Sequence, residues 1–196
     1  MKTKMKAYTV KHRRRREAKT DYKQRLRLLS SNKFRVVIKR GINNFLVQFI
    51  QYGEKGDKVL VSVHSRELLK YGWELHRGNM SAAYLSGYLC GLKAKKSGIK
   101  NCIIDFGTVG AIKKSSLFAV VKGLIDAGID LPYSKEALPD QETISGKKVV
   151  DYALVLKNNK DLYSKQFSSY DKKGIKVEET QKIFQNTKTK IGEKWQ

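Results

Sequence analysis

The stretch FRVVIKRGINNFLVQFIQYGEKGDKVLVSVH, residues 34–64, decides the fold because it holds three strand-like runs separated by short turns. The runs FRVVIKR (34–40), FLVQFIQY (45–52) and KVLVSVH (58–64) are rich in β-branched and aromatic residues, which favour strands. The intervening GINN and GEKGD carry the glycine, asparagine and aspartate that are typical of hairpin turns. Short hairpin loops join antiparallel neighbours, so the stretch predicts an antiparallel meander.

The pattern changes to a helical period after this stretch. Residues 79–96 are predicted to form a helix whose first turn is capped by Asn79. The small residues Ala83, Gly87 and Gly91 are spaced four apart, so they share one face of that helix. We expect this face to pack closely on a sheet.

Three further elements are predicted around the long helix, two after it and one before it. Residues 99–106, IKNCIIDF, read as a buried strand, and 115–127 as an amphipathic helix that ends at Gly128, while 65–71 fit a short helix. Strands followed by helix–strand–helix predict an α/β (α+β-like) fold, with helices packed on one mixed β-sheet. We place this domain at residues 20–150.

The two ends of the chain differ from the predicted domain. Residues 1–19 form a basic segment without hydrophobic periodicity, which we expect to stay extended until an anion neutralises it. Thr20 or Asp21 then caps a short helix whose Tyr22 and Leu26 share a face with Leu29. Residues 151–196 look helical, polar and lysine-rich, and we expect this extension to lie on a partner.

Positive charge is concentrated near the N-terminus. The chain has 196 residues with 41 Lys and Arg against 18 Asp and Glu, a formal charge of +23, and residues 1–40 alone carry 16 basic and 2 acidic residues, a net +14. All ten arginines lie at or before Arg77. A guanidinium pairs with phosphate through a flat fork, whereas an ammonium acts as a point charge. The arginine placement predicts defined phosphate contacts in the N-terminal third, which general solubility does not explain.

Composition excludes several classes of protein. The hydrophobic share of 40% is too high for a wholly disordered basic chain. No apolar run approaches the roughly 20 residues of a membrane span, and no apolar stretch follows the basic N-terminus as in a secretory signal. The two cysteines, Cys90 and Cys102, are too few for a disulfide framework and fit a reducing cytosol. We expect a cytoplasmic protein with a polyanionic partner and no membrane partner.

The sequence shows no converging catalytic or metal-ligating set. His12, His64 and His76 lie in a basic tail, at a strand end and in a loop, and none has a Cys or carboxylate at metal-ligand spacing. His64 is followed by Ser65, which we interpret as a helix cap, and Asp105 is a lone carboxylate suited to a turn. We therefore expect no enzymatic activity, no cofactor, no metal and no small-molecule substrate.

A glycine loop, GTVGAIKKSS at 107–116, fails the phosphate-binding pattern G-x-x-x-x-G-K-[ST] in either register. What remains is a loop that carries Lys113 and Lys114 just before a predicted helix. Such a loop is suited to bind an RNA phosphate, and it fits equally well a solvent-exposed connection between two elements.

The strongest signal is a basic constellation interleaved with aromatic side chains. Without a recognition helix, zinc finger or zipper for the DNA major groove, an extended arm and irregular loops fit folded RNA better. Tyr22 and Phe34 also fit core positions, and charge alone leaves DNA compaction open. The candidate RNA-binding residues here are Lys11, Arg13, Arg14, Arg15, Arg16, Tyr22, Lys23, Arg25, Arg27, Arg35, Lys39 and Arg40.

The pattern RRRRE--TDY--RL-LL (13–29) resembles the N-terminal signature of the archaeal and eukaryotic large-subunit ribosomal proteins that bind 5S rRNA, the L-eighteen family. The resemblance continues in order through GDKVLVSVHSREL (56–68), YGW (71–73) and GN--AAYL-G (78–87) to FA--KG--DAG---P (118–132). It covers almost all of residues 11–153, and LYSKQFSSY near the C-terminus resembles the extension of archaeal members.

The resemblance implies a structural protein of the cytoplasmic large ribosomal subunit. It implies that the protein joins 5S rRNA to the large-subunit rRNA in the central protuberance, beside neighbouring proteins that include the L-five family. On matching positions it places RNA contacts at Arg13–Arg16, Tyr22, Arg25, Arg35 and Arg40, and it adds the segment His64, Ser65 and Arg66, with Arg66 as a second contact. The chain departs from the family pattern at 108–116. The alternative is a non-ribosomal protein that binds or processes structured RNA.

Overall fold

A computed structural model describes residues 9–195. Within them, four strands form one mixed sheet in the order β3-β2-β1-β4. Strands β1 (Phe34–Arg40), β2 (Phe45–Gln51) and β3 (Lys58–His64) pair antiparallel as a meander, and β4 (Cys102–Asp105) joins β1 in parallel. This confirms the predicted meander and the predicted mixed sheet, although β4 is shorter than the eight residues expected of it.

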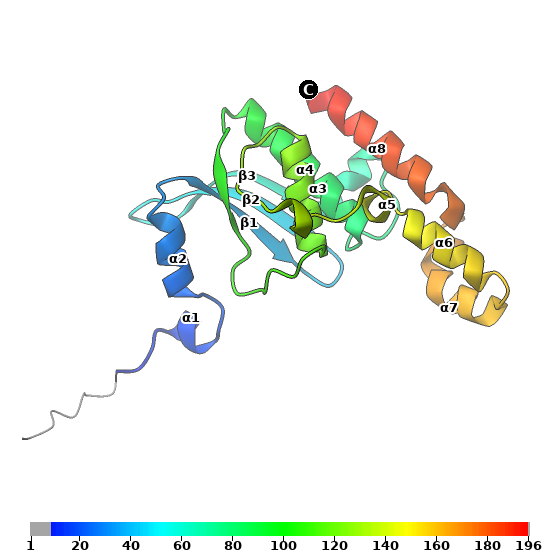
Figure 1. Cartoon of the computed structure of the whole chain (residues 1–196), viewed down its shortest axis with the longest axis horizontal. Coiled ribbons are helices and arrows are strands. Elements are labelled where there is room, and N and C mark those ends of the chain that lie inside the picture. Colours follow the sequence, from blue (N-terminus) through cyan, green and yellow to red (C-terminus); the bar gives the residue numbers. More distant parts are fainter. Residues whose placement is uncertain (1–8, 196) are drawn as a thin grey trace, which may run out of the picture.

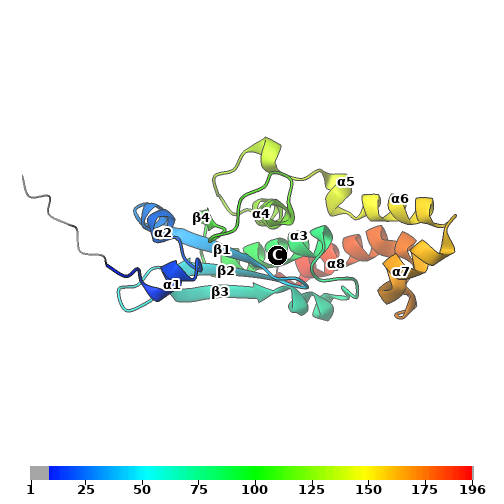
Figure 2. The same ribbon diagram turned by 90° about the horizontal axis from the view of Figure 1, so that it is seen from below.

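Two helices cover one face of this sheet (Figure 2). They are α3 (Met80–Lys96), which Asn79 caps as predicted, and α4 (Ser116–Asp126). Side chains of alternate strand residues, such as Val36, Ile38 and Val47, face these helices and form the main core. The opposite face of the sheet carries the intervening residues, and α1 (Arg13–Arg16) lies near one end of the strands in Figure 2.

The predicted partner of the α3 glycines was wrong. A Cβ built on Gly87 would lie 2.2 Å from the carbonyl oxygen of Val120, and one on Gly123 would lie 2.2 Å from that of Tyr84. The small residues therefore let α3 approach α4, not the sheet. Both helices are apolar on their facing sides, so close contact of the two backbones buries that surface.

The C-terminal part of the chain is helical, and its last helix returns to the domain. Phe184 and Ile191 of α8 join the main core, and the Trp195 indole N–H donates to the Tyr71 hydroxyl at 2.8 Å. A smaller cluster around Phe167 holds the preceding helices together. These elements lie at the end of the molecule remote from α1 and α2 (Figure 1). They are α5 (Gln141–Ile144), α6 (Lys147–Leu156), α7 (Lys160–Asp171), the 3-10 turn η3 (Val177–Glu179) and α8 (Thr180–Trp195).

Two short elements differ from their predictions in conformation or capping. Residues 13–16 form the helical turn α1, although we expected an extended arm, while residues 1–8 lie outside the described part. The short helix after β3 is a 3-10 helix, η1 (Ser65–Tyr71), and its cap is His64, not Ser65. A further 3-10 turn, η2 (Lys135–Ala137), interrupts the loop between α4 and α5.

Candidate RNA-binding surface

Side chains of the turn between α1 and α2 (Tyr22–Leu29) pair with one another. The Arg14 Nε donates to Thr20 Oγ1 at 2.9 Å, and Glu17 pairs with Arg13 at 2.9 Å and with Lys19 at 2.7 Å. Ala18 adopts a left-handed backbone with φ of 50°, which ends α1. Basic side chains of the segment are thus presented from an ordered turn.

Several cations of this region have no partner within the protein. Among residues 9–195, no side-chain hydrogen bond or ion pair is formed by Lys11, Arg15, Arg16, Lys23 or Arg27, and all five are exposed. An exposed cation without an internal partner keeps its charge available for an external anion. These five side chains carry free charge on the arm and on α2.

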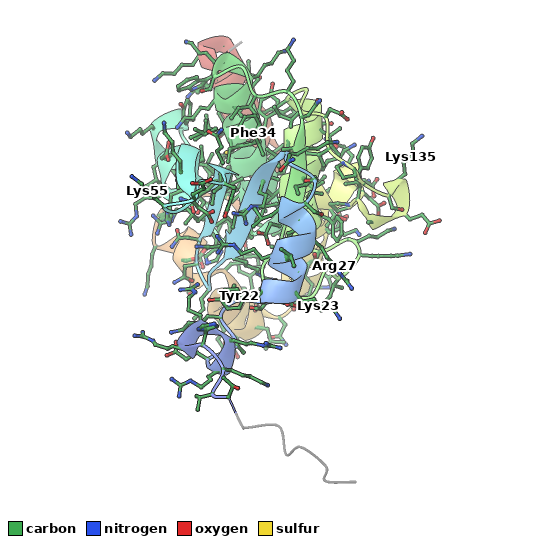
Figure 3. The ribbon with its side chains drawn as sticks, turned by 90° about the vertical axis from the view of Figure 1, so that its left-hand side faces the viewer. Tyr22, Lys23, Arg27, Phe34, Lys55 and Lys135 are labelled. Carbon is green, nitrogen blue, oxygen red and sulfur yellow. The ribbon has the colours of Figure 1, made fainter. Side chains whose placement is uncertain are left out.

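Helix α2 begins where the sequence predicts, but its side chains pack against the rest of the protein less than the sequence predicts. The Asp21 carboxylate accepts hydrogen bonds from the backbone N–H groups of Lys23 and Gln24, which confirms Asp21 as the cap. No side chain of the helix is buried, and Tyr22 is exposed, so it is not a core residue. Tyr22 and Lys23 lie close to each other at the start of α2, and Arg27 lies farther along it (Figure 3).

Arg35 is the one basic candidate that the structure places inside the protein. Its side chain is buried; Nη1 lies 2.9 Å from Asp105 Oδ2, and Nη2 lies 2.8 Å from Asp57 Oδ2. The parallel pairing of β1 with β4 brings Asp105 beside it. Both terminal nitrogens of the guanidinium are occupied by carboxylates, which corrects the prediction of Arg35 as a phosphate contact.

The same two carboxylates tie Arg35 to its surroundings. Asp57 also pairs with Arg25 of α2 at 2.9 Å, and Asp105 Oδ1 accepts the Gly107 N–H at 2.8 Å. The network therefore fixes three segments at one end of the sheet: α2, the β2–β3 turn and the start of the 107–115 loop. Arg25 itself is half-buried, so it links this network to the surface.

Beyond Arg35, the open face of the sheet continues as a basic strip. Lys39 is exposed on the same face of β1, and it lines a hollow of about 190 Å³ with Arg14, Lys19 and Arg25. Arg40 follows at the exposed end of the strand. The arm and β1 thus share one cationic surface.

The segment 64–66 lies at the other end of the sheet, about 20 Å along β3 from the turn that holds Asp57. His64 Nδ1 accepts the Arg66 N–H at 3.1 Å, and Arg66 is exposed. Ser65 is fully buried: its hydroxyl accepts the Phe45 N–H at 3.1 Å and lies 3.3 Å from Asn44 Oδ1. This corrects the prediction of Ser65 as a contact, because its hydroxyl is used to close the β1–β2 turn.

The lysines of the 107–116 loop are exposed and partly neutralised. Lys113 Nζ lies 3.2 Å from Glu136 Oε2, and Lys114 Nζ lies 3.6 Å from Asp140 Oδ1. Exposed pairs of this kind are weak, so a stronger anion displaces them readily. Neither lysine lines the hollows beside α1 and α2, and the structure does not bring them together with the arginines.

Other kinds of site find no support within the described residues. No group of three or more metal-ligating side chains gathers there, and none of the helices there has the length and apolarity that crossing a bilayer requires. Cys90 and Cys102 are buried free thiols.

Sequence reasoning missed the carboxylates Asp57 and Asp105 as organisers of the surface. The alternation of β1 held part of the signal, since Arg35 shares a face with Val37 and not with Val36 and Ile38. Asp57 and Asp105 both pair with Arg35, and each lies far from Arg35 in the sequence, so residue spacing alone does not reveal the network.

Comparisons with known proteins identify the family of the chain. Residues 6–100 match the family model described as "Ribosomal large subunit proteins 60S L5, and 50S L18". The large ribosomal subunit protein uL18 of Methanococcus maripaludis is 46% identical over 184 residues, which cover 94% of this chain and 95% of that protein. Identity of this extent over most of both chains shows that the chain belongs to the uL18 family of large ribosomal subunit proteins.

Proposed function

We propose that the chain binds 5S rRNA and attaches it to the large-subunit rRNA in the central protuberance, as a structural protein without enzymatic activity. Membership of the family makes the chain an RNA-binding constituent of the large ribosomal subunit, which is a cytoplasmic particle. The proposal adds which RNA is bound and where. It also adds neighbouring large-subunit proteins, including the L-five family, as partners.

The observation that carries the proposal is the unpaired charge on α1 and α2. Arg15, Arg16, Lys23 and Arg27 project from two short helices whose geometry is fixed by internal bonds. Phosphate contacts position a protein on a nucleic acid, and an ordered set of them favours one RNA shape over another. A disordered basic tail lacks that geometric preference.

The proposed contacts extend from this set over the exposed basic side chains of the surface. Arg35 and Ser65 act within it as internal supports, and residues 1–19 act as an arm on the folded domain. The proposed RNA contacts are Lys11, Arg13, Arg14, Arg15, Arg16, Tyr22, Lys23, Arg25, Arg27, Lys39, Arg40, His64, Arg66, Lys113 and Lys114.

A salt-titrated competition tests the proposal. The full chain is offered 5S rRNA, an unrelated structured RNA of equal length and duplex DNA. We expect a preference for 5S rRNA that persists at moderate salt, because shape-specific contacts add to the salt-dependent phosphate term. Equal binding to all three, abolished together as salt rises, would contradict the assignment to 5S rRNA. Preference for both RNAs over DNA without discrimination between them would favour a general structured-RNA binder.

A further inference from the structure

A hollow of about 540 Å³ opens beside α2, where the turn after α1 meets the loop after β4. Arg15 lines it from α1, Ala18 from the turn, Tyr22, Lys23 and Leu26 from α2, and Thr108 from the loop. It is separate from the hollow that holds Arg35 and Lys39, although both share the backbone around Thr20.

The hollow has an apolar side that the protein leaves uncovered. Tyr22 is 40% exposed and Leu26 is 71% exposed, and the two lie one helical turn apart on the same face of α2. Neither belongs to a core cluster. The ring of His12 approaches Tyr22 with centroids 6.3 Å apart and the planes tilted by 55°, so the two rings are not stacked. An aromatic ring and a leucine are thus offered to a flat apolar group.

The charges around the hollow indicate what that group carries. Arg15 and Lys23 line it and have no partner among the described residues. Its one carboxylate, Asp21, already accepts two backbone N–H groups of α2. The net field therefore favours an anion beside the apolar surface. A nucleotide combines a flat aromatic base with an adjacent phosphate, whereas an acidic peptide segment seldom presents a flat apolar face.

We propose that this hollow holds one unstacked nucleobase of the bound RNA. The base stacks on Tyr22 and contacts Leu26, while Arg15 and Lys23 bind the flanking phosphates. Single-stranded loops and bulges supply such bases, and stacking on tyrosine tolerates any base type. This inference rests on the proposed function and deepens it, because it adds a stacking contact to a surface otherwise described by charge.

Stacking and charge respond differently to salt, which gives a direct test. The affinity of the full chain for 5S rRNA is measured at several salt concentrations for wild type, Tyr22→Ala, Tyr22→Phe and Lys23→Ala. Removal of a stacking platform lowers affinity by about 5- to 150-fold. We expect Tyr22→Ala to show this decrease with an unchanged salt slope, Tyr22→Phe to retain affinity, and Lys23→Ala to reduce the slope.

Tyr133→Ala is the matched control, since Tyr133 is 44% exposed in a loop and lies outside the hollow. Circular dichroism verifies that each variant is folded. Full affinity of Tyr22→Ala, or an equal decrease in Tyr133→Ala, would overturn the stacking site while leaving RNA binding intact, and the hollow would then fit a protein segment better. A wild-type chain with no preference for 5S rRNA over duplex DNA would overturn the proposed function and this inference together.

Discussion

Arg35 and Lys39 lie four residues apart on the same face of β1, but their surroundings differ completely. Arg35 is buried between two carboxylates, whereas Lys39 is exposed and has no internal partner among the described residues. A buried charge whose partner is removed is left uncompensated in a medium of low polarity. An exposed lysine carries no such penalty. The two positions therefore separate stability from RNA binding.

Replacing each residue by methionine makes the contrast measurable. Arg35→Met leaves Asp105 without its buried partner and weakens the network at Asp57, and we expect the free energy of unfolding to fall by about 3–5 kcal/mol, toward the lower end because Asp57 is partly solvated. Lys39→Met should change it by less than about 0.5 kcal/mol and should weaken RNA binding with a smaller salt slope. Urea unfolding and salt-dependent binding give both values. A stable Arg35→Met variant with weakened RNA binding would show that Arg35 is a phosphate contact after all.

The buried thiols make stability sensitive to alkaline pH. Burial raises the pKa of Cys102 from 9.0 to about 12, and burial also raises the pKa of Cys90 strongly. Both thiols ionise near pH 9 once unfolded, so their contribution to stability is full below pH 9 and decreases as pH rises above it; for Cys102 the contribution is lost by about pH 12. We expect urea midpoints to fall over that window, less steeply in Cys102→Ala. Neither thiol should react with a thiol reagent at about pH 8 until the chain unfolds, because the thiolate is the reactive form; rapid labelling of the native protein would contradict this.

At the scale of elements, the contact between α3 and α4 depends on two glycines. A Cβ at Gly87 meets the backbone of Val120 at 2.2 Å, and one at Gly123 meets the backbone of Tyr84 at 2.2 Å, so neither helix accommodates a methyl group without moving. We expect Gly87→Ala or Gly123→Ala to lower the free energy of unfolding by about 1–3 kcal/mol. Gly110→Ala is the control, because no atom lies within 4 Å of its Cβ position and its backbone is outside the left-handed region. Thermal or urea unfolding measures the three variants; unaltered stability of both helix variants would show that the helices separate freely.

Elements specified by local rules were predictable, and their partners were not. The alternation in 34–64 and the caps Asp21 and Asn79 act over a few residues, and each appears in the structure where the sequence placed it. The packing of Gly87 on α4 depends on Val120, which lies 33 residues farther along the chain. A stripe of small residues signals a close approach but contains no information about which element approaches.

The candidate surface was also predictable only where no tertiary partner is involved. Its exposed arginines were evident from composition and order, because charge needs no tertiary partner to be recognised. The burial of Arg35 was not evident, since Asp57 and Asp105 are 22 and 70 residues away. Leu26 was expected to share a helix face with Tyr22 and Leu29, and periodicity does not reveal that Leu26 stays exposed on it.

At the scale of the whole molecule, the C-terminal helix is part of the fold. Phe184 is almost fully buried against Tyr84 of α3, with ring centroids 5.6 Å apart. We expect Phe184→Ala to lower the free energy of unfolding by about 3–5 kcal/mol, because it removes a large buried side chain. The neighbouring exposed Gln185 provides the control, and Gln185→Ala should be nearly neutral. Equal stability of the two variants in urea would show that α8 docks only loosely.

In contrast to α8, the N-terminal segment contributes charge and no described core residue. Residues 1–19 carry nine Lys and Arg against one acid, and none of residues 9–19 is buried. Their removal subtracts charge but no described core, so a chain that begins at Thr20 should unfold at an unchanged urea concentration. Its RNA affinity should fall steeply at low salt, and its salt slope should become shallower, because the shortened chain neutralises fewer phosphates and so releases fewer counterions on binding.

Charge-preserving replacements separate the amount of charge from its geometry. Lysine at Arg13, Arg14, Arg15 and Arg16 keeps the net charge of the arm but removes the forked donors and the Arg14 bond to Thr20. We expect this variant to keep most of the salt slope and yet bind 5S rRNA more weakly than wild type. If it binds as tightly as wild type, the arm acts through charge alone; if the truncated chain also binds normally, the arm is not the principal RNA contact. The salt slope of the RNA affinity reports how many phosphates the protein neutralises. The difference in affinity between the lysine variant and wild type, which carry the same charge, measures what the arginine geometry contributes.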